Sequence, residues 1–466
     1  MNNTLKIASR NIFRNVRRSL MTISAIAVGA IALLLFGEFF GQIKAGLQTT
    51  FVMQTGHLAI FKRGYFDFGS GNPSAYGIKN YEEIMQTIQA DANLKSKINV
   101  ITPTIRLFGI AGNYDLETSK TFFAAGVIPD DYNKMRKWDQ HGLKFEPSWT
   151  NAVFTSQDES HGIAGVGIAK ILGLCEALKL GDCPKLEILK PKAETSQTRD
   201  FGNLGSDDLK SQNLTQGQAN ARLDLLAGTA SGAPNVVSFY VDKAVPQGVK
   251  ELDDSFIGMN FTLAQKLLYG RDGKNANAVM IQLHQTEDMI PFKKKIEKTF
   301  QDHQWDLEVK DLEELAPFYK QAVGMFSSIF AFIAVIMAVI ALFTVVNTMS
   351  MSVMERINEI GTIRALGVKK TGVSRQFVIE GSLLGLIGAT AGIVLGSIIA
   401  EIVNRSGLKW LPPGQAQPIP LKVLNHGVGD LIFGIWFGLV IMATLAAYWP
   451  ARRAAQLKIV DALGHL

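Results

Sequence analysis

Residues 322–346 read AVGMFSSIFAFIAVIMAVIALFTVV and contain no charged side chain. A helix of about 20 apolar residues is long enough to cross the hydrocarbon core of a bilayer, so this stretch predicts a transmembrane helix. Residues 20–40, 381–400 and 431–449 are also long and apolar, and Glu38 is the one charged residue among them. The sequence therefore predicts four transmembrane helices.

The long segment between the first and second of these helices has a different character. Residues 44–320 are too polar and irregular to lie in lipid, where each unpaired backbone group would cost several kcal/mol. Strand-like patterns occur at residues 55–62, 100–110, 278–283 and 307–309, and helical patterns at 81–90 and 288–300. Residues 193–234 are rich in polar residues and glycine, which predicts a long mobile loop. The predicted fold is membrane α-helical, with a large α+β extracytoplasmic domain inserted between helices 1 and 2.

Basic residues indicate which side of the membrane each end faces. Arg10, Arg14, Arg17 and Arg18 precede the first helix without an acidic residue among them, as is typical of cytoplasmic flanks. Further basic residues lie between helices 2 and 3 and after helix 4, which places both termini in the cytoplasm. The predicted order is a cytoplasmic amphipathic helix (1–18), helix 1 (19–43), the large domain (44–320), helix 2 (321–350), a cytoplasmic loop (351–376), helix 3 (377–402), a short outer loop (403–429), helix 4 (430–449) and a cytoplasmic tail (450–466).

Missing motifs argue against several functions. The net charge of +6 is compatible with nucleic-acid binding, but the basic residues border membrane helices and no nucleic-acid-binding signature accompanies them. A phosphate-binding loop is also missing, since Gly273-Lys274 is followed by Asn275 and lacks the spaced first glycine. We therefore expect no nucleic-acid binding, no metal or cofactor in this chain, and no enzymatic activity of its own.

Cys175 and Cys183 are the only cysteines in the sequence. Neither has a Cys or His neighbour at the spacing of a zinc site. Both lie in the predicted extracytoplasmic domain, where oxidising conditions favour disulfides. We expect a bridge between them, and two buried free thiols are the alternative.

The loop between helices 2 and 3 carries a distinctive pattern. Residues 354–367 read MERINEIGTIRALG and interleave charges with isoleucines. Ile360, Ile363 and Gly367 fall on one helical face. So much apolar surface in a short segment beside the membrane favours a docking surface over a solvated loop.

This segment and four others resemble the MacB/FtsX-like permease family, the type VII or mechanotransmission permeases of ABC transporters. The resembling stretches are RNIFRNVRRS at 10–19, MERINEIGTIRALG at 354–367, FVIEG at 377–381, PARRAA at 450–455 and DAL at 461–463. The resemblance implies a coupling helix seated on an ABC ATPase, with contacts from Glu355, Arg356, Glu359, Ile360 and Arg364. It also implies a second permease copy, an ATPase dimer that binds ATP and Mg, and a bacterial inner membrane with the large domain in the periplasm.

Three stretches in the large domain resemble the lipoprotein-releasing (LolC/LolE-like) subgroup. They are TGHLAI at 55–60, GVGIAKILG at 165–173 and LGD at 180–182, with CEAL at 175–178 as a local insertion. The resemblance implies extraction of a lipoprotein or other amphiphile from the outer leaflet of the membrane, for delivery to a periplasmic carrier. MacB-like efflux of drugs, peptides or toxins through an adaptor and FtsX-like signalling to a cell-wall hydrolase are the alternatives.

Large apolar side chains lie near the outer ends of helices 1 and 2. By the same resemblance they would line the site where a substrate leaves the lipid: Phe36, Phe39, Phe40, Met325, Phe326 and Phe330. Aromatic residues that simply face lipid or the interface are the alternative.

Helix 3 carries five glycines at spacings of four, three, four and four, which places them along one side: Gly381, Gly385, Gly388, Gly392 and Gly396. Small residues let helix backbones approach closely, which is a main source of helix association in lipid. We therefore expect this side to pack against helix 2 or 4, with Ala389 on the opposite face.

Overall fold

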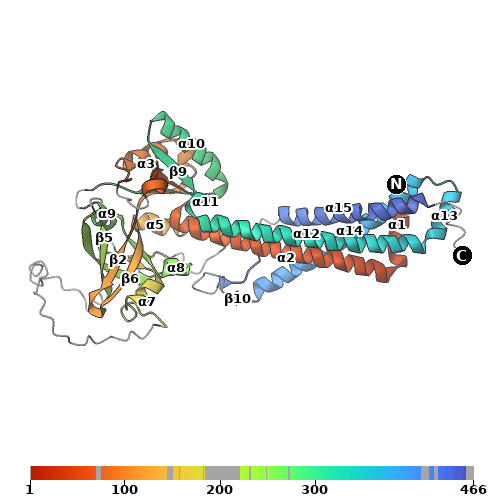
Figure 1. Cartoon of the computed structure of the whole chain (residues 1–466), viewed down its shortest axis with the longest axis horizontal. Helices are drawn as coiled ribbons and strands as arrows, with labels where there is room; N and C mark the ends of the chain where they lie inside the picture. Colours follow the sequence, from red (N-terminus) through yellow and green to blue (C-terminus); the bar gives the residue numbers. More distant parts are fainter. Residues whose placement is uncertain are drawn as a thin grey trace, which may run out of the picture. The chain divides into compact units, whose positions relative to one another are not determined.

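The chain divides into two compact units in the computed structural model (Figure 1). The helical unit comprises Met1–Gly46, Phe318–Trp410 and Ile419–Leu466, and the sheet unit comprises Leu47–Pro317 and Leu411–Pro418. The residues that the structure describes are 2–69, 75–143, 151–156, 158–181, 183, 221–229, 232–247, 249–270, 273–410, 419–423 and 429–457.

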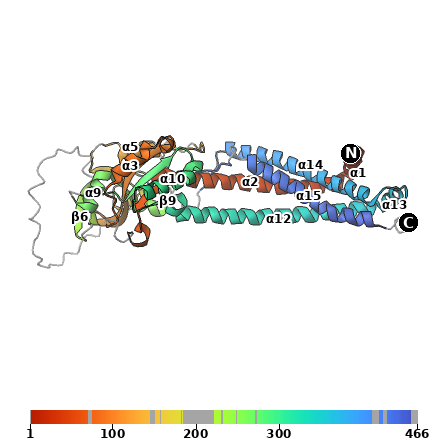
Figure 2. The same cartoon turned by 90° about the horizontal axis from the view of Figure 1, so that it is seen from above.

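Long apolar helices build the helical unit (Figure 2). Within the described ranges, four helices are long and apolar enough to cross a membrane: α2 (Val16–Thr55), α12 (Pro317–Glu355), α14 (Lys370–Arg405) and α15 (Gly429–Gln456). The unit also contains α1 (Asn2–Arg14), α13 (Ile357–Ala365) and the short paired strands β10 (Lys409–Trp410) and β11 (Ile419–Pro420). The prediction of four spanning helices is confirmed, and each predicted span lies inside one of them.

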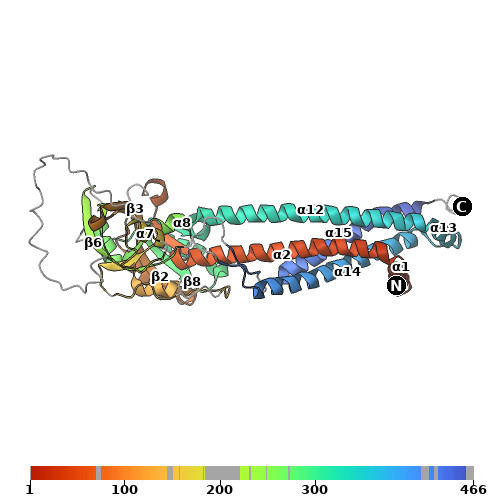
Figure 3. The same ribbon diagram turned by 90° about the horizontal axis from the view of Figure 1, so that it is seen from below.

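Helix α14 lies beside α2 and α15 (Figure 3), and its glycines face these two helices. A side chain added at Gly381 would collide with Ala447 of α15. The last three glycines of the stripe face α2, where an added Cβ would lie 2.5–2.9 Å from atoms of Ile26, Ala30 or Leu34. The stripe therefore packs against helices 4 and 1, and the contact with helix 1 is one that the sequence did not predict.

Ala389 does not lie on an exposed face of α14. It is 0% exposed and belongs to the apolar core that α2, α12, α14 and α15 share, so the prediction for this residue is wrong. Two helices flank the glycine stripe, and the buried arc of α14 is therefore wider than the stripe itself. Leu386, Val394 and Ser397 are on the exposed side instead.

The sheet unit contains, in its described part, a nine-stranded sheet with the strand order β3-β7-β4-β6-β5-β2-β8-β1-β9. Its strands are β1 (Leu58–Lys62), β2 (Ile98–Asn113), β3 (Thr118–Val127), β4 (His161–Ala164), β5 (Arg222–Gly228), β6 (Pro234–Ala244), β7 (Phe256–Asn260), β8 (Ala278–Leu283) and β9 (Leu307–Asp311). Its helices are α3 (Tyr81–Ala90), α4 (Ala92–Lys95), α5 (Pro129–Met135), α7 (Val166–Ile171), α8 (Lys250–Asp253), α9 (Phe261–Tyr269), α10 (Met289–Asp302) and α11 (Leu312–Leu315), with the short turns η1 (Tyr65–Gly69), η2 (Tyr114–Leu116) and η4 (Thr286–Asp288).

The long strand β2 joins two parts of this sheet. Its first half pairs with β8, and its second half pairs with β3 and β5. Because β3 also reaches β7, six strands close into a ring, and β8, β1 and β9 extend from it. One apolar core lies between the ring strands and α7 and α9, and a second lies between β1, β8, β9 and the helices α3 and α10. The predicted α+β domain is confirmed.

Part of the polar stretch at 193–234 is a β-strand. Residues 221–229 are described, and Arg222–Gly228 form strand β5 inside the sheet. The alternation in that strand buries Leu223, Leu225 and Ala227 against the core. The loop prediction is therefore wrong for these residues, and residues 193–220 lie outside the described part of the chain.

Helix α2 ends at a glycine and leads directly into the sheet. Gly56 has a φ of +75°, a conformation that favours glycine, and the next residue begins the approach to β1. His57 is fully buried there, and the backbone N–H of Leu283 donates to its Nδ1 at 3.0 Å. The ring proton therefore sits on Nε2, 3.1 Å from the Thr286 hydroxyl. Burial lowers the pKa of His57 to about 4, so the ring is neutral at neutral pH.

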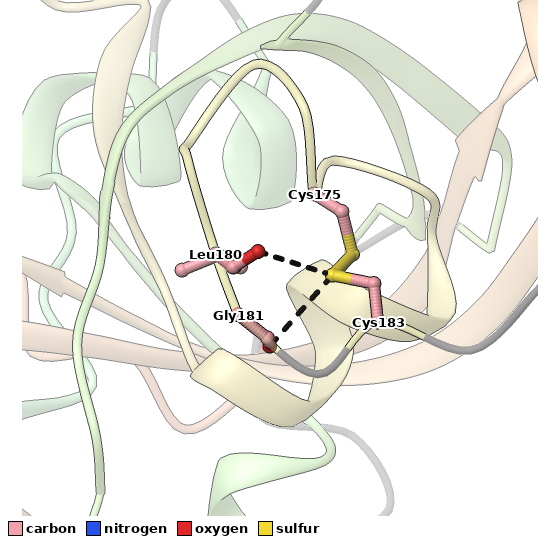
Figure 4. The surroundings of a disulfide bond; sticks show 4 residues. All are labelled: Cys175, Leu180, Gly181 and Cys183. Atoms are coloured by element: carbon pink, nitrogen blue, oxygen red, sulfur yellow. Dashed lines mark hydrogen bonds between the residues drawn. A yellow bond between two sulfur atoms is a disulfide. The ribbon is translucent and has the colours of Figure 1, made fainter.

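The glycine-containing segment after β4 is a strand-to-helix turn. The backbone N–H groups of Val166 and Gly167 both donate to the Asp253 carboxylate at 3.0 Å. The Asp253 side chain therefore satisfies the backbone N–H groups at the start of α7. Farther along, Cys175 and Cys183 are joined by a disulfide, as Figure 4 shows.

We expect Gly392→Leu to destabilise the helical unit, because the leucine would have to displace Ala30 of α2. Overpacking of this kind costs about 1–3 kcal/mol or more. Ser397→Leu is the matched control, since it adds a leucine on the exposed side of the same helix. Thermal unfolding of the full chain in detergent measures both variants, and equal unfolding midpoints would contradict the packing role of the stripe.

Candidate functional site: a polar junction around the helix α13

Arg356 is the single residue between the end of α12 and the start of α13, and its guanidinium is buried. The side chain is only 8% exposed and donates to Glu359 at 3.0 Å and to Glu380 at 3.3 Å. The guanidinium also lies over the ring of Phe377, 5.3 Å from its centroid. A buried arginine requires such partners, because its charge is permanent and its removal from water is costly.

Glu380 is the second buried charge at this place. Its side chain is 6% exposed, and the carboxylate accepts from Asn11 of α1 at 3.4 Å as well as from Arg356. Ala8 and Ile12 of α1 are buried on the same side. The carboxylate of one α14 residue therefore connects α1 with the start of α13.

Two further ion pairs connect the beginning of the chain with α12 and α13. Arg18 donates to both carboxylate oxygens of Glu355, and Asn15 adds a hydrogen bond of 3.0 Å to the same group. Arg14 pairs with Glu359 at 2.6 Å. Forked pairing of an arginine with one carboxylate fixes orientation as well as distance. We call the connected set the polar junction; it comprises Asn11, Arg14, Asn15, Arg18, Glu355, Arg356, Glu359 and Glu380.

The junction determines the charge of Glu359. Partial burial of this carboxyl opposes its ionisation, but hydrogen bonds from Arg14 and Arg356 outweigh that effect and hold its pKa below the usual value. Glu359 is therefore an anion at neutral pH and stays available to both arginines.

The cavity inside the junction is very small. It measures about 10 Å³ and lies between α1, α2, α12 and α14, with Asn11, Ser19, Thr348 and Arg356 among its lining residues. A volume of this size is close to the lower limit for one water molecule. This cavity can therefore hold neither a nucleotide nor a transported molecule. The polar junction connects helices and does not enclose a ligand-sized space.

Helix α13 is also attached to α15 on its other side. Ile360 is buried in an apolar cluster with Val373 and Ala454. Arg364 donates to the backbone carbonyl groups of Ala455 and Leu457, at 3.2 and 2.5 Å. A cation at a helix C-terminus also satisfies carbonyl groups that have no partner within the helix.

The five residues expected at an ATPase contact thus have partners within their own chain. Arg356 and Ile360 are buried, while Glu355, Glu359 and Arg364 are partly exposed and already bonded to other helices. Their contact with an ATPase stays a prediction, and the structure gives them a role in joining helices.

The exposed apolar residues of this region are different ones. Leu366 is 81% exposed, Val368 42% and Ile363 36%, and we call these three the α13 tip. Exposed Lys369 and Lys370 follow directly in the sequence. The docking surface predicted within 354–367 contains Ile363 and Leu366, and Val368 lies just beyond it. In the sequence, Leu366 and Val368 stand on either side of Gly367. The φ of +94° at Gly367 ends the helical conformation, and both neighbours are exposed there.

The aromatic residues of helices 1 and 2 meet in pairs. Phe36 stacks on Phe330 with centroids 6.2 Å apart, and Phe40 stacks on Phe326 at 5.8 Å. Phe39 instead contacts Trp410 at 5.4 Å, a partner that the sequence did not suggest. The last member of the predicted set, Met325, is 54% exposed. Four of the six predicted residues thus pair between α2 and α12, whereas Phe39 contacts β10 and Met325 is exposed. In the described part of the chain, no three His, Cys, Asp or Glu residues gather as metal ligands.

A family model described as FtsX-like permease C-terminal matches residues 331–459, a range that contains α13, α14 and α15. An uncharacterized ABC transporter permease of Methanocaldococcus jannaschii is 29% identical over 230 residues, which cover 48% of this chain and 54% of the relative. The macrolide export ATP-binding/permease protein MacB 1 of Yersinia pestis bv. Antiqua is 36% identical over 131 residues, 28% of this chain and 18% of the relative. The chain thus spans about half the length of the first relative and less of the second.

One solved structure also aligns with part of the chain. It is the extracellular domain of the noncanonic ABC-type transporter YknZ from Gram-positive bacteria, which aligns over 55% of this chain and 99% of its own length. The sequence identity is 13% and the TM-score is 0.26, which is too low to establish a shared fold.

We expect Arg356→Ala to destabilise the chain strongly, because it leaves the Glu380 carboxylate buried without its cation. Loss of one partner from a buried pair costs about 3–5 kcal/mol. The double variant Arg356→Met with Glu380→Leu should recover part of this loss, since both charges are then absent. Arg452→Ala, at an exposed arginine, is the control for thermal unfolding in detergent. A loss from Arg356→Ala no larger than that of the control would show that the junction does not hold the helices together.

Proposed function

We propose that the chain is the membrane subunit of an ABC transporter whose ATP is hydrolysed by a partner, because residues 331–459 match a family model described as FtsX-like permease C-terminal. The sequence lacks a phosphate-binding loop. Relatives named as ABC transporter permease and as ATP-binding/permease protein support an ABC ATPase as that partner. ATP and Mg would then be bound outside this chain, by an ATPase dimer that serves two permease copies.

The observation that carries this proposal is the combination of an exposed tip and a buried junction on one short helix. The α13 tip offers apolar side chains to a partner, with Leu366 the most exposed of the three. Arg356 and Glu359 connect the other end of the helix to α1 and α14, and Arg364 connects it to α15. A movement imposed on the tip would therefore reach several helices at once, as coupling requires.

The proposed orientation places α13 in the cytoplasm and the sheet unit outside it, in the periplasm of a bacterial cell. Arg10, Arg14, Arg17 and Arg18 flank α2 at the same end as the junction, as the rule for cytoplasmic flanks requires. The disulfide between Cys175 and Cys183 lies in the sheet unit, and disulfides persist in oxidising compartments.

The substrate that we propose is a lipoprotein or another amphiphile taken from the outer leaflet of the inner membrane. Its support is the row of aromatic pairs between α2 and α12, where Phe36, Phe40, Phe326 and Phe330 are only partly buried. Partly exposed aromatic faces in the span suit an acyl chain. A periplasmic carrier would receive the product.

Export of a smaller amphiphile is the second candidate. It is favoured by the relatives named as macrolide export proteins. In that case an adaptor and an outer-membrane duct would replace the carrier. Signalling to a cell-wall hydrolase has no observation in its favour beyond the family model.

We expect Leu366→Glu to uncouple the ATPase, because a charge would enter the apolar contact of the α13 tip. A central apolar contact is worth about 1–2 kcal/mol or more, so ATP hydrolysis that co-purifies with a tagged full chain should fall about tenfold or more. Leu408→Glu is the control, since Leu408 is also a highly exposed leucine but lies beyond the other end of α14. Unchanged ATPase activity with Leu366→Glu would exclude the tip as the docking surface.

The substrate class can be read from photocrosslinking. A benzophenone amino acid in place of Phe326, next to Phe40, should capture a lipidated protein in living cells. The same substitution at Phe343, an exposed phenylalanine farther along α12, should capture lipid only. Capture of a small amphiphile at position 326 without protein would favour export, and identical products at both positions would contradict a substrate site between α2 and α12.

A further inference from the structure

Glu38 is the one acidic or basic residue in the apolar stretches that identify the four spanning helices, and Glu380 and Glu401 border the third of these stretches. No other Asp, Glu, Lys, Arg or His occurs in residues 19–43, 321–354, 381–400 or 431–451. A charge in the interior of a bilayer is strongly unfavourable, and ionisable residues there are usually functional. The polar junction and the aromatic pairs leave Glu38 without a role.

The side chain of Glu38 is enclosed by the helical unit. The residue is 2% exposed, and its Oε2 atom has no hydrogen-bond partner. Helices α2 and α14 run in the same direction, because Gly388 faces Ile26 and Gly396 faces Leu34. One turn farther on each helix, helical spacing places Glu38 opposite Ala400, which is 0% exposed and whose side chain is a methyl group.

The other neighbours of α2 at this level are apolar as well. The residue before Glu38 is Gly37, and its surroundings are Phe330 of α12 and Leu431 of α15. The next charges along α14 are Glu401 and Arg405, which pair with each other at 2.6 Å near the exposed end of the helix. Lys44 of α2 and Lys409 of β10 are exposed. No cation of the described residues pairs with Glu38 in the structure.

An ionised carboxylate without a partner is strongly unfavourable in such surroundings, whereas a carboxylic acid is neutral. We propose that Glu38 is a proton-binding site: the carboxyl group keeps its proton while α2 and α14 are packed together. When the two helices part and water reaches the group, the O–H bond breaks and the proton passes to water. Helix separation and proton release are thereby linked, and a higher pH favours the separated arrangement.

Dicyclohexylcarbodiimide tests the protonation state, because this apolar reagent adds to protonated carboxyl groups and leaves carboxylates in ion pairs unmodified. The full chain in lipid nanodiscs is treated at pH 6, 7.5 and 9, and peptides are analysed by mass spectrometry. We expect an adduct at Glu38, its loss in Glu38→Gln, and no adduct at Glu380, which is paired with Arg356. Once the acid ionises, labelling should fall about tenfold per pH unit. Lack of an adduct at pH 6 would overturn the proposal.

Thermal unfolding provides a second test that needs no reagent. The packed state binds a proton that the unfolded state releases, so the unfolding midpoint of the natural chain should fall as the pH rises from 6 to 9. The Glu38→Gln variant keeps a neutral side chain of the same size at every pH, and its midpoint should fall less. Parallel pH profiles for the two proteins would overturn the proposal. Glu38→Leu, which is also neutral, should follow the profile of the Gln variant. This outcome is independent of whether the chain transports an amphiphile or another substrate.

Discussion

The permanent charge of Arg356 is the constraint on which the arrangement of the short helix α13 depends. A guanidinium does not lose its proton, so a buried one has to be surrounded by acceptors. Glu359 and Glu380 supply them from two different helices, and each is held in turn by a residue of α1, Arg14 or Asn11. The position of α1 therefore follows from the need to satisfy one buried arginine.

The spanning helices are held together by a different kind of contact. Lipid is as apolar as a leucine side chain, so close packing of small residues has to replace the hydrophobic effect. Glycines of α14 provide this contact with α2 and α15. Helix α12 differs, because only 11% of its apolar window is buried, against 44% for α2. It meets α2 through aromatic pairs, the Arg18–Glu355 ion pair and a hydroxyl contact, Thr22 with Thr348 at 2.7 Å. Because α12 leads directly to Arg356, the spanning helix with the smallest buried share ends at the polar junction.

Local patterns explain what could be predicted from the sequence. Charge-free stretches identified all four spanning helices, and the predicted bounds of α3 and β8 agree with the structure residue for residue. The strand β5 was missed because the polar residues before it hide its alternating pattern, and the ring of strands was missed because pairing with β2 joins residues far apart in the sequence. For the site, the helix α13 was found, but which of its charges face inward depends on α1 and α14. No spacing within 354–367 reveals that Arg356 points to Glu380.

Paired and unpaired charges have opposite consequences in the same helical unit. Every carboxylate of the polar junction has an arginine partner, so its charge is stable and the helices that it joins move together. Glu38 has no such partner, and its charge state is therefore set by whether water can reach it. A helix pair held by small residues can part without breaking an ion pair, since Gly396 and Ala400 contribute only van der Waals contact. A movement transmitted through α13 would thus keep the junction intact, and a separation of α2 from α14 near Glu38 would break no ion pair.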